Sequence, residues 1–254
     1  MALHGVVLIF LFAPLHETIH ESAFASRRLN AVVAWVCGMA LLLPPSYFRA
    51  FHFAHHRWTQ DPRRDPELAQ PKPATLAAYL IQVSGLPYWR ERLATTLAHA
   101  CGRYRAAGFL TPAARRAMIA EARWLWAGYA ALAGLAAATA SWAPVLYWLG
   151  PAILGQPALR LYLMAEHTGC ALDPNMLINS RTTLTNRVMR RLSWNMPFHI
   201  EHHVYPSVPF HALPALHDAL RDRLGVVSPG YLAFHAGLIG DLAAGRGPTP
   251  ATRR

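Results

Sequence analysis

Cysteine and charge are both scarce in this sequence. Its three cysteines, Cys37, Cys101 and Cys170, lie far apart and form no C-x-x-C pair. That spacing excludes a disulfide framework and a cysteine-bound zinc or iron–sulfur site, and it indicates a reducing compartment. Charged residues make up only 15% of the chain, against about 25% in an ordinary soluble protein. The low charge favours a membrane protein.

Lysine is almost absent, since Lys72 is the only one, and arginine supplies nearly all of the formal net charge of +11. A strong positive charge can serve nucleic acid, anionic lipid or an acidic protein. Apolar residues make up 54% of the chain and gather in long segments. We therefore expect lipid and an acidic protein as partners, and no nucleic acid.

The apolar segments cover residues 2–15, 31–43, 75–86, 124–142 and 143–162. A full membrane span needs about 20 residues. Residues 124–162 are long enough for a hairpin of two membrane helices with a turn near residues 141–144, and tryptophan and tyrosine gather near its ends. Residues 2–15 lack a basic start and a cleavage site, so we expect a retained membrane helix there.

These patterns predict an all-α, integral membrane helical domain. It would be a single domain over residues 1–244, followed by a Gly, Pro and Arg tail at residues 245–254 that we expect to be disordered. Residues 61–73 are rich in proline and charge and predict a loop, and residues 215–224 predict a short helix. The arginine-rich stretch at residues 90–123 is expected to lie on an anionic membrane surface.

Histidine is the residue that points to chemistry. Of 14 histidines, eight fall in three clusters, one H-x-x-x-H and two H-x-x-H-H. On a helix, residues three or four apart share a face, so each cluster aims its imidazoles at one point. Eight imidazoles exceed the four to six ligands or so that one ion takes, which predicts two metals. The clusters are His16 and His20; His52, His55 and His56; and His199, His202 and His203.

Two other classes of protein fit part of this pattern. The run from His16 to His20 reads H-E-x-x-H, which in a membrane zinc metalloprotease supplies two ligands and the base Glu17. That alternative leaves six clustered histidines unexplained. A non-catalytic metal-binding or transport protein would place its ligands inside the membrane spans, whereas these clusters flank them. Measured metal content separates the three classes: two irons, one zinc or a variable load.

Together the three clusters and the long apolar segment before the third resemble the membrane fatty acid desaturase superfamily, which also contains carotenoid ketolases and hydroxylases. The run from His55 through Thr59 to Asp65-Pro66-Glu67 is similar to the family's stretch after its second histidine box. The run Asn195-Met196-Pro197-Phe198 before His199, with Tyr205-Pro206 after the cluster, is similar to the third. The resemblance covers most of the chain.

The resemblance implies that the three clusters hold two irons and that His167, about thirty residues before the third cluster, is a ninth ligand. It implies activation of O2 to desaturate or hydroxylate an apolar substrate, with a fatty acyl chain as the first expectation and a carotenoid or other hydrocarbon as the alternative. No flavin, haem or ferredoxin signature is present. Electrons would therefore come from a separate carrier of the ferredoxin or cytochrome b5 type, with its reductase.

Topology can be predicted by counting residues. Residues 21–51 are too few for two full spans between the first two clusters. Residues 31–43 are therefore expected to be interfacial or re-entrant, while the hairpin at residues 124–162 returns the chain to its starting face. Arginines flank the clusters, which by the positive-inside rule makes that face cytoplasmic. We expect a protein of the bacterial inner membrane with a cytoplasmic, histidine-rich cap.

Other polar residues receive lesser roles. Carboxylates near the clusters are expected to orient imidazoles through their second ring nitrogens; these are Glu17, Glu21, Asp61, Asp65, Glu166 and Glu201. The remaining histidines are expected to be structural or exposed, with His211 and His217 nearest the site; the others are His4, His99 and His235. Alanine at His235 is predicted to leave activity largely intact.

Overall fold

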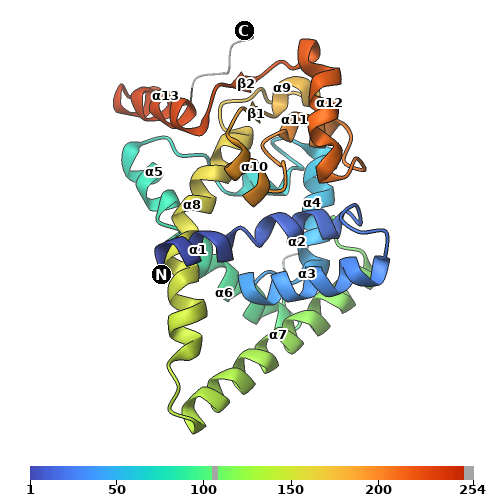
Figure 1. The fold of residues 1–254 in the computed structure, drawn as a ribbon, viewed down its shortest axis with the longest axis vertical. Coiled ribbons are helices and arrows are strands. Elements are labelled where there is room, and N and C mark those ends of the chain that lie inside the picture. Colours follow the sequence, from blue (N-terminus) through green and yellow to red (C-terminus); the bar gives the residue numbers. More distant parts are fainter. Residues whose placement is uncertain (105–107, 249–254) are drawn as a thin grey trace. The chain divides into compact units, whose positions relative to one another are not determined.

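The computed structural model describes residues 1–104 and 108–248, and it is mostly helical (Figure 1). This confirms the predicted helical class. Arg105 in the arginine-rich stretch and residues 249–254 of the predicted tail lie outside the described residues. The chain divides into two compact units, Met1–His52 with Gly85–Leu159 and Phe53–Ser84 with Arg160–Arg254. Each unit therefore combines two stretches that are far apart in the sequence.

The elements follow in chain order. Unit 1 contains α1 (Ala2–Ile9), α2 (Phe12–Ile19), α3 (Arg27–Leu41), α6 (Leu86–Ala100), α7 (Pro112–Ala138) and the π-helix η2 (Val145–Leu149). Two helices, α4 (Pro45–Trp58) and α8 (Gly150–His167), begin in unit 1 and end in unit 2. Unit 2 contains η1 (Pro66–Ala69), α5 (Leu76–Val83), α9 (Met176–Asn179), β1 (Thr182–Thr183), α10 (Arg187–Leu192), α11 (His199–Val204), η3 (Phe210–Ala212), α12 (Leu213–Leu220), η4 (Arg221–Arg223), β2 (Val227–Ser228) and α13 (Tyr231–Ala243).

Polar side chains bond the first turns of three helices that begin in unit 1. The hydroxyl of Ser26 accepts a hydrogen bond from the Leu29 amide and starts α3, and Thr111 starts α7 in the same way. Glu121 of α7 accepts hydrogen bonds from the backbone amide and the hydroxyl of Ser46, at 2.8 and 2.6 Å. That carboxylate therefore satisfies an amide in the first turn of α4, the helix that carries the second histidine motif.

The apolar segments differ in extent from their prediction. Residues 2–15 form α1 and α2, and the apolar stretch Ala2–Ile19 is the one helix among the described residues that is long and apolar enough to cross a membrane. A second candidate is the pair Arg27–Leu41 and Pro45–Trp58, which is bent by 96° in the manner of a broken span or a re-entrant loop. Membrane integration itself stays a prediction.

The region predicted as a hairpin begins earlier than expected. Helix α7 starts at Pro112, twelve residues before the predicted start at residue 124, because Thr111 and Pro112 supply a strong helix start. The chain turns between α7 and η2, near the predicted position, with Ala140 at a positive φ of 48°. Large apolar side chains along α7, η2 and the first half of α8 are exposed, including Trp124, Leu135, Trp142, Tyr147 and Ile153.

Unit 2 contains little regular structure between its helices. Its strands β1 and β2 form a parallel pair of two residues each, Thr182 with Val227 and Thr183 with Ser228. A small apolar cluster of Tyr79, Leu238 and Leu242 joins α5 to α13. The short helix predicted at residues 215–224 is α12, which begins two residues earlier and continues as η4, whereas α13 was not predicted.

Helices α1 and α8 approach each other closely within unit 1 at two glycines. A Cβ on Gly155 would lie 2.1 Å from the carbonyl oxygen of Gly5, and a Cβ on Gly5 would lie 2.2 Å from the carbonyl oxygen of Pro151. Backbone atoms cannot move aside as a flexible side chain can. The contact between the two backbones therefore requires glycine at both positions, as at small-residue helix contacts in membranes.

Replacing Gly155 by alanine is expected to lower the free energy of unfolding by about 1–3 kcal/mol, the usual cost of overpacking. The measurement is the thermal unfolding midpoint of the purified protein in detergent. Gly134→Ala on α7 is the matched control, because its Cβ would meet nothing within 4 Å. The control should be neutral or stabilising, since alanine favours the helix. Equal midpoints for the two variants would contradict the backbone contact.

Candidate metal centre

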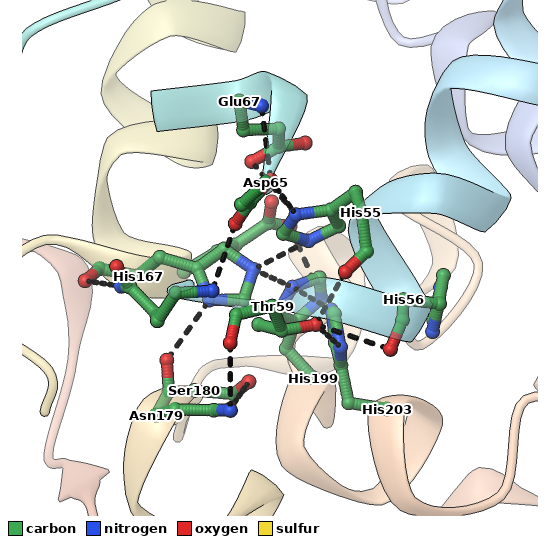
Figure 2. Close-up of polar contacts among 12 residues, drawn as sticks. His55, His56, Thr59, Asp65, Glu67, His167, Asn179, Ser180, His199 and His203 are labelled. Carbon is green, nitrogen blue, oxygen red and sulfur yellow. Dashed lines mark hydrogen bonds and ion pairs between the residues drawn. The ribbon is translucent and has the colours of Figure 1, made fainter. Parts of the chain in front are cut away.

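Six histidines lie together in unit 2, and Figure 2 labels all of them except His202. They come from the end of α4, the end of α8 and the short helix α11, and none is more than 8% exposed. The spacing of three and four residues places the imidazoles of α11 on one face, as the sequence predicted. We call this set the six-histidine cluster: His55, His56, His167, His199, His202 and His203.

A tight turn before α11 sets the direction of this helix toward the cluster. Trp194 and Asn195 both adopt positive φ angles, 51° and 58°, directly before Met196 and Pro197. The side-chain amide of Asn195 donates a hydrogen bond to the carbonyl of Phe210 at 3.0 Å, which holds the turn in place. Asparagine adopts this left-handed conformation more readily than most residues. Asn195, which begins the run that resembles the family's third motif, therefore also shapes the turn before α11.

The Nε2 atoms of the cluster face one another at short range. His167 Nε2 lies 3.2 Å from His55 Nε2 and 2.9 Å from His199 Nε2. His203 Nε2 lies 3.1 Å from His199 Nε2, and a second contact joins His56 Nε2 to His202 Nε2 at 3.1 Å. Nitrogens bound to one metal at roughly 2.1 Å are about 3 Å apart when their bonds meet at right angles. The spacing therefore suits a shared metal.

The opposite ring nitrogens of His55 and His167 are held by the protein. His55 Nδ1 lies 3.0 Å from a carboxylate oxygen of Asp65, and His167 Nδ1 lies 3.1 Å from the carbonyl oxygen of Asn179. Both partners accept hydrogen bonds, so each Nδ1 donates and each neutral ring presents a lone pair at Nε2. Two lone pairs at 3.2 Å repel each other unless a cation lies beside them. The arrangement therefore fits a metal ion, and His55, His167 and His203 satisfy the geometry of a three-ligand group.

Electrostatics favour neutral, metal-ready imidazoles at His199 and His203, whereas His55 is an exception. Burial, followed by the nearby His55, lowers the pKa of His199 to about 3. Burial, followed by the neighbouring histidines, also brings the pKa of His203 well below its ordinary value. Burial alone would lower the pKa of His55, but the carboxylates of Glu67 and Asp65 outweigh that effect and raise it. Neutral imidazole is the form that binds a metal.

A second histidine group lies in unit 1. The rings of His16 and His20 on α2 have their centroids 5.1 Å apart. The His52 ring of α4 lies 4.4 Å from His16 and 5.0 Å from His20. The first motif therefore meets the first histidine of the second motif, and we call this set the three-histidine cluster. The structure thus distributes all nine predicted residues over these two clusters, while their role as metal ligands stays a prediction.

The predicted orienting carboxylates separate into different roles. Asp65 contacts a histidine of the cluster, and Glu166 lies 3.5 Å from His199 Nδ1. Glu201 contacts His217 and Thr182, both at 2.5 Å. Glu17 accepts a hydrogen bond from the hydroxyl of Ser22. Glu21 pairs with Arg27 and Arg49, and Asp61 pairs with Arg64. Neither carboxylate has a histidine among its described partners.

The isolated histidines are structural or exposed, as predicted. His217 lies near the site through its contact with Glu201, whereas His211 is exposed. His235 is buried; its Nδ1 lies 3.1 Å from the hydroxyl of Tyr79 and its Nε2 lies 3.0 Å from the carbonyl oxygen of Leu161. His99 packs its ring 4.8 Å from Tyr47.

Sequence reasoning missed the polar residues that support the cluster. Thr59 Oγ1 lies 3.2 Å from His203 Nδ1 and donates to the His55 carbonyl. Gln60 donates to the His167 carbonyl at 2.8 Å, and Asn179 accepts from the ring of His167. One signal was present: residues 176–196 contain many polar residues but neither glycine nor proline, which is unusual for an ordinary loop.

The protein is thus mostly helical, and its buried histidines fit a metal site. A comparison with protein families matches residues 1–235 to the family Fatty acid desaturase. The chain belongs to the fatty acid desaturase family, as its motifs indicated. No curated protein matches the chain.

Asp65 offers a direct test of how the cluster is held. Asp65→Asn removes the negative charge that fixes the Nδ1 proton of His55, so metal affinity is expected to fall about 10- to 100-fold. Competition with a chelator, using Fe(II) under anaerobic conditions, measures this. Asp61→Asn is the control, because the Asp61 carboxylate accepts a hydrogen bond from the Arg63 amide and lies 3.3 Å from the Arg64 side chain, with no histidine among its described partners. Unchanged affinity in Asp65→Asn would contradict the role of the carboxylate.

Proposed function

We propose that this chain is a membrane-bound di-iron oxidoreductase that uses O2 to desaturate or hydroxylate an apolar substrate, first of all a fatty acyl chain. Membership of the family supports an oxidoreductase with a lipid substrate. The observation that carries the proposal is the set of buried histidine nitrogens about 3 Å apart, with the lone pairs of His55 and His167 facing each other. Imidazole is a suitable ligand for iron.

The proposed ligands are the nine histidines of the two clusters. Helix α4 supplies His52 to the three-histidine cluster and His55 and His56 to the six-histidine cluster, so that one continuous helix carries ligands of both. Two bound irons would supply the activation of O2 that attack on an unactivated C–H bond requires. The chain's own residues keep the rings neutral, fix their orientation and exclude water.

The proposed setting is the bacterial inner membrane, with the histidines on the cytoplasmic side. Exposed tryptophan, tyrosine and leucine side chains along α7, η2 and α8 support contact with lipid, because soluble proteins rarely expose such extended apolar surfaces. Electrons are proposed to come from a separate carrier of the ferredoxin or cytochrome b5 type. The exposed Arg57, Arg63 and Arg64 of unit 2 would suit an acidic partner.

Two alternatives lead to different measurements. A carotenoid or other hydrocarbon as substrate would use the same histidines, and lipid profiling after heterologous expression distinguishes it from an acyl chain. A zinc metalloprotease would need Glu17 as its base, yet one carboxylate oxygen of Glu17 accepts a hydrogen bond from Ser22. That alternative also gives no role to the six-histidine cluster. Metal analysis of the purified protein should find two irons per chain and little zinc.

His202→Ala is expected to abolish activity and lower the iron content, while the protein still inserts in the membrane. The physical reason is that His202 lies in the six-histidine cluster, 3.1 Å from His56, whereas insertion depends on the apolar helices. Product formation, iron per chain and membrane fractionation are the measurements. His211→Ala is the matched control, since His211 is an exposed histidine of the same unit. Full activity in His202→Ala would end the proposal.

Topology provides an independent test. Cysteine is introduced singly at residues 28, 63, 116, 142 and 187, which are all exposed, in a background lacking Cys37, Cys101 and Cys170. An impermeant thiol reagent in intact cells should label position 142 alone, because the turn after α7 is the only one of these sites proposed to reach the outer face. Labelling at 63 but not at 28 would put the first two histidine motifs on opposite faces and exclude a shared centre.

A further inference from the structure

A run of five polar residues is almost completely buried in unit 2. Residues 179–183 read Asn-Ser-Arg-Thr-Thr, and none of them is more than 6% exposed. Burying polar groups is unfavourable unless each finds a hydrogen-bond partner. The run contains β1, but a strand pair of two residues does not account for so much buried polarity. The partners of its side chains show what the run contacts.

Arg181 contacts the end of the helix that carries His167. Its two terminal guanidinium nitrogens donate to the carbonyls of Ala165 and Thr168, at 2.5 and 2.8 Å, and its backbone amide donates to the carbonyl of Glu166 at 2.8 Å. Carbonyls at a helix C-terminus have no partner within the helix and carry partial negative charge. A buried guanidinium, without a carboxylate paired to it among the described contacts, therefore binds the last turn of α8.

Two neighbouring contacts hold the same turn. The Arg181 guanidinium carbon lies 4.6 Å from the centre of the Phe234 ring, which covers it from the side of α13. Asn179 accepts a hydrogen bond from the ring of His167, and its side-chain amide donates to the carbonyl of Thr59 at 3.3 Å. The run thus links the end of α8 to the end of α4.

The remaining residues of the run contact the third motif. Thr182 donates to a carboxylate oxygen of Glu201 at 2.5 Å, and the other oxygen of Glu201 lies 2.5 Å from His217. Glu201 lies on the face of α11 opposite His199, His202 and His203, because it is two residues from His199 and His203 in a helix. The Thr183 amide donates to the Pro197 carbonyl at 2.9 Å, directly before α11.

We propose that residues 179–183 are the positioning segment of the six-histidine cluster, and that Arg181 is a positioning residue that acts through His167. The segment holds the ends of α4, α8 and α11 together, so that histidines from three separate stretches of chain keep their Nε2 atoms about 3 Å apart. The inference deepens the proposed function and rests on it only where the histidines are taken as metal ligands.

The first experiment measures metal affinity. Full-length Arg181→Met, Arg181→Lys and Thr182→Val are purified in detergent beside Arg187→Met, an exposed arginine that serves as control. Arg181→Met should weaken Fe(II) and Co(II) binding about 10- to 100-fold and change the visible absorption of bound Co(II). Arg181→Lys should recover only part of the loss, because an ammonium group cannot donate in two fixed directions to two carbonyls. Arg187→Met should match the wild type.

A double-variant comparison separates positioning from general destabilisation. If Arg181 acts through His167, Arg181→Met combined with His167→Ala should bind metal no more weakly than His167→Ala alone. Additive losses, or wild-type affinity and absorption in Arg181→Met, would overturn the inference while leaving the proposed function intact. Should Arg181→Met fail to fold, Arg181→Lys carries the same comparison.

A metal-free readout keeps the inference independent of the proposed function. Hydrogen–deuterium exchange at residues 164–170 of the metal-free protein should be faster in Arg181→Lys than in the wild type, and unchanged in Arg187→Met, because the end of α8 loses its guanidinium partner. Unchanged exchange in Arg181→Lys would overturn the inference. A wild-type protein that binds neither ion would instead contradict the proposed function, while this readout still decides the role of Arg181.

Discussion

The contact on which the rest of unit 2 depends is the meeting of imidazole nitrogens from three helices in a buried space. His167 Nε2 lies within 3.2 Å of two other Nε2 atoms, and burial lowers the pKa of both His167 and His199. Such a group is electrostatically unfavourable without a cation. Its surroundings must therefore hold the rings in place through contacts made on their other sides.

Those contacts explain the polar interior of unit 2. Asp65 holds His55, the Asn179 carbonyl holds His167, and Thr59 lies beside His203. Asp65 also accepts hydrogen bonds from the Gln60 and Glu67 amides, so that the loop after α4 folds around a carboxylate. These polar residues are buried and orient the imidazoles, as expected of groups that support metal ligands.

The sequence allowed much of this to be predicted, because the decisive signals are local. The spacing of His199, His202 and His203 on one face needs only helix geometry, and the family resemblance followed from the residues around it. The role of His167 as a proposed ligand needed the family pattern, since a single histidine carries no spacing. Residues 179–183 could not be placed, because the partners that link them to the helix ends are 12 to 120 residues away in the chain and their polarity is typical of a surface loop. Helix α7 begins before the predicted hairpin because Thr111 and Pro112 start a helix in the arginine-rich stretch, where the apolar pattern has not yet begun.

The two units differ in the side chains that they bury and expose. Unit 1 exposes large apolar side chains along α7 and the first half of α8, and the association with lipid proposed for them would require no metal. Unit 2 buries histidines, threonines and Arg181, and a ligand that binds its folded state alone would stabilise it. On the proposed function, metal binding would stabilise the histidine clusters without being needed for insertion, because the exposed apolar side chains of α7 and α8 would meet lipid whether or not a metal is bound.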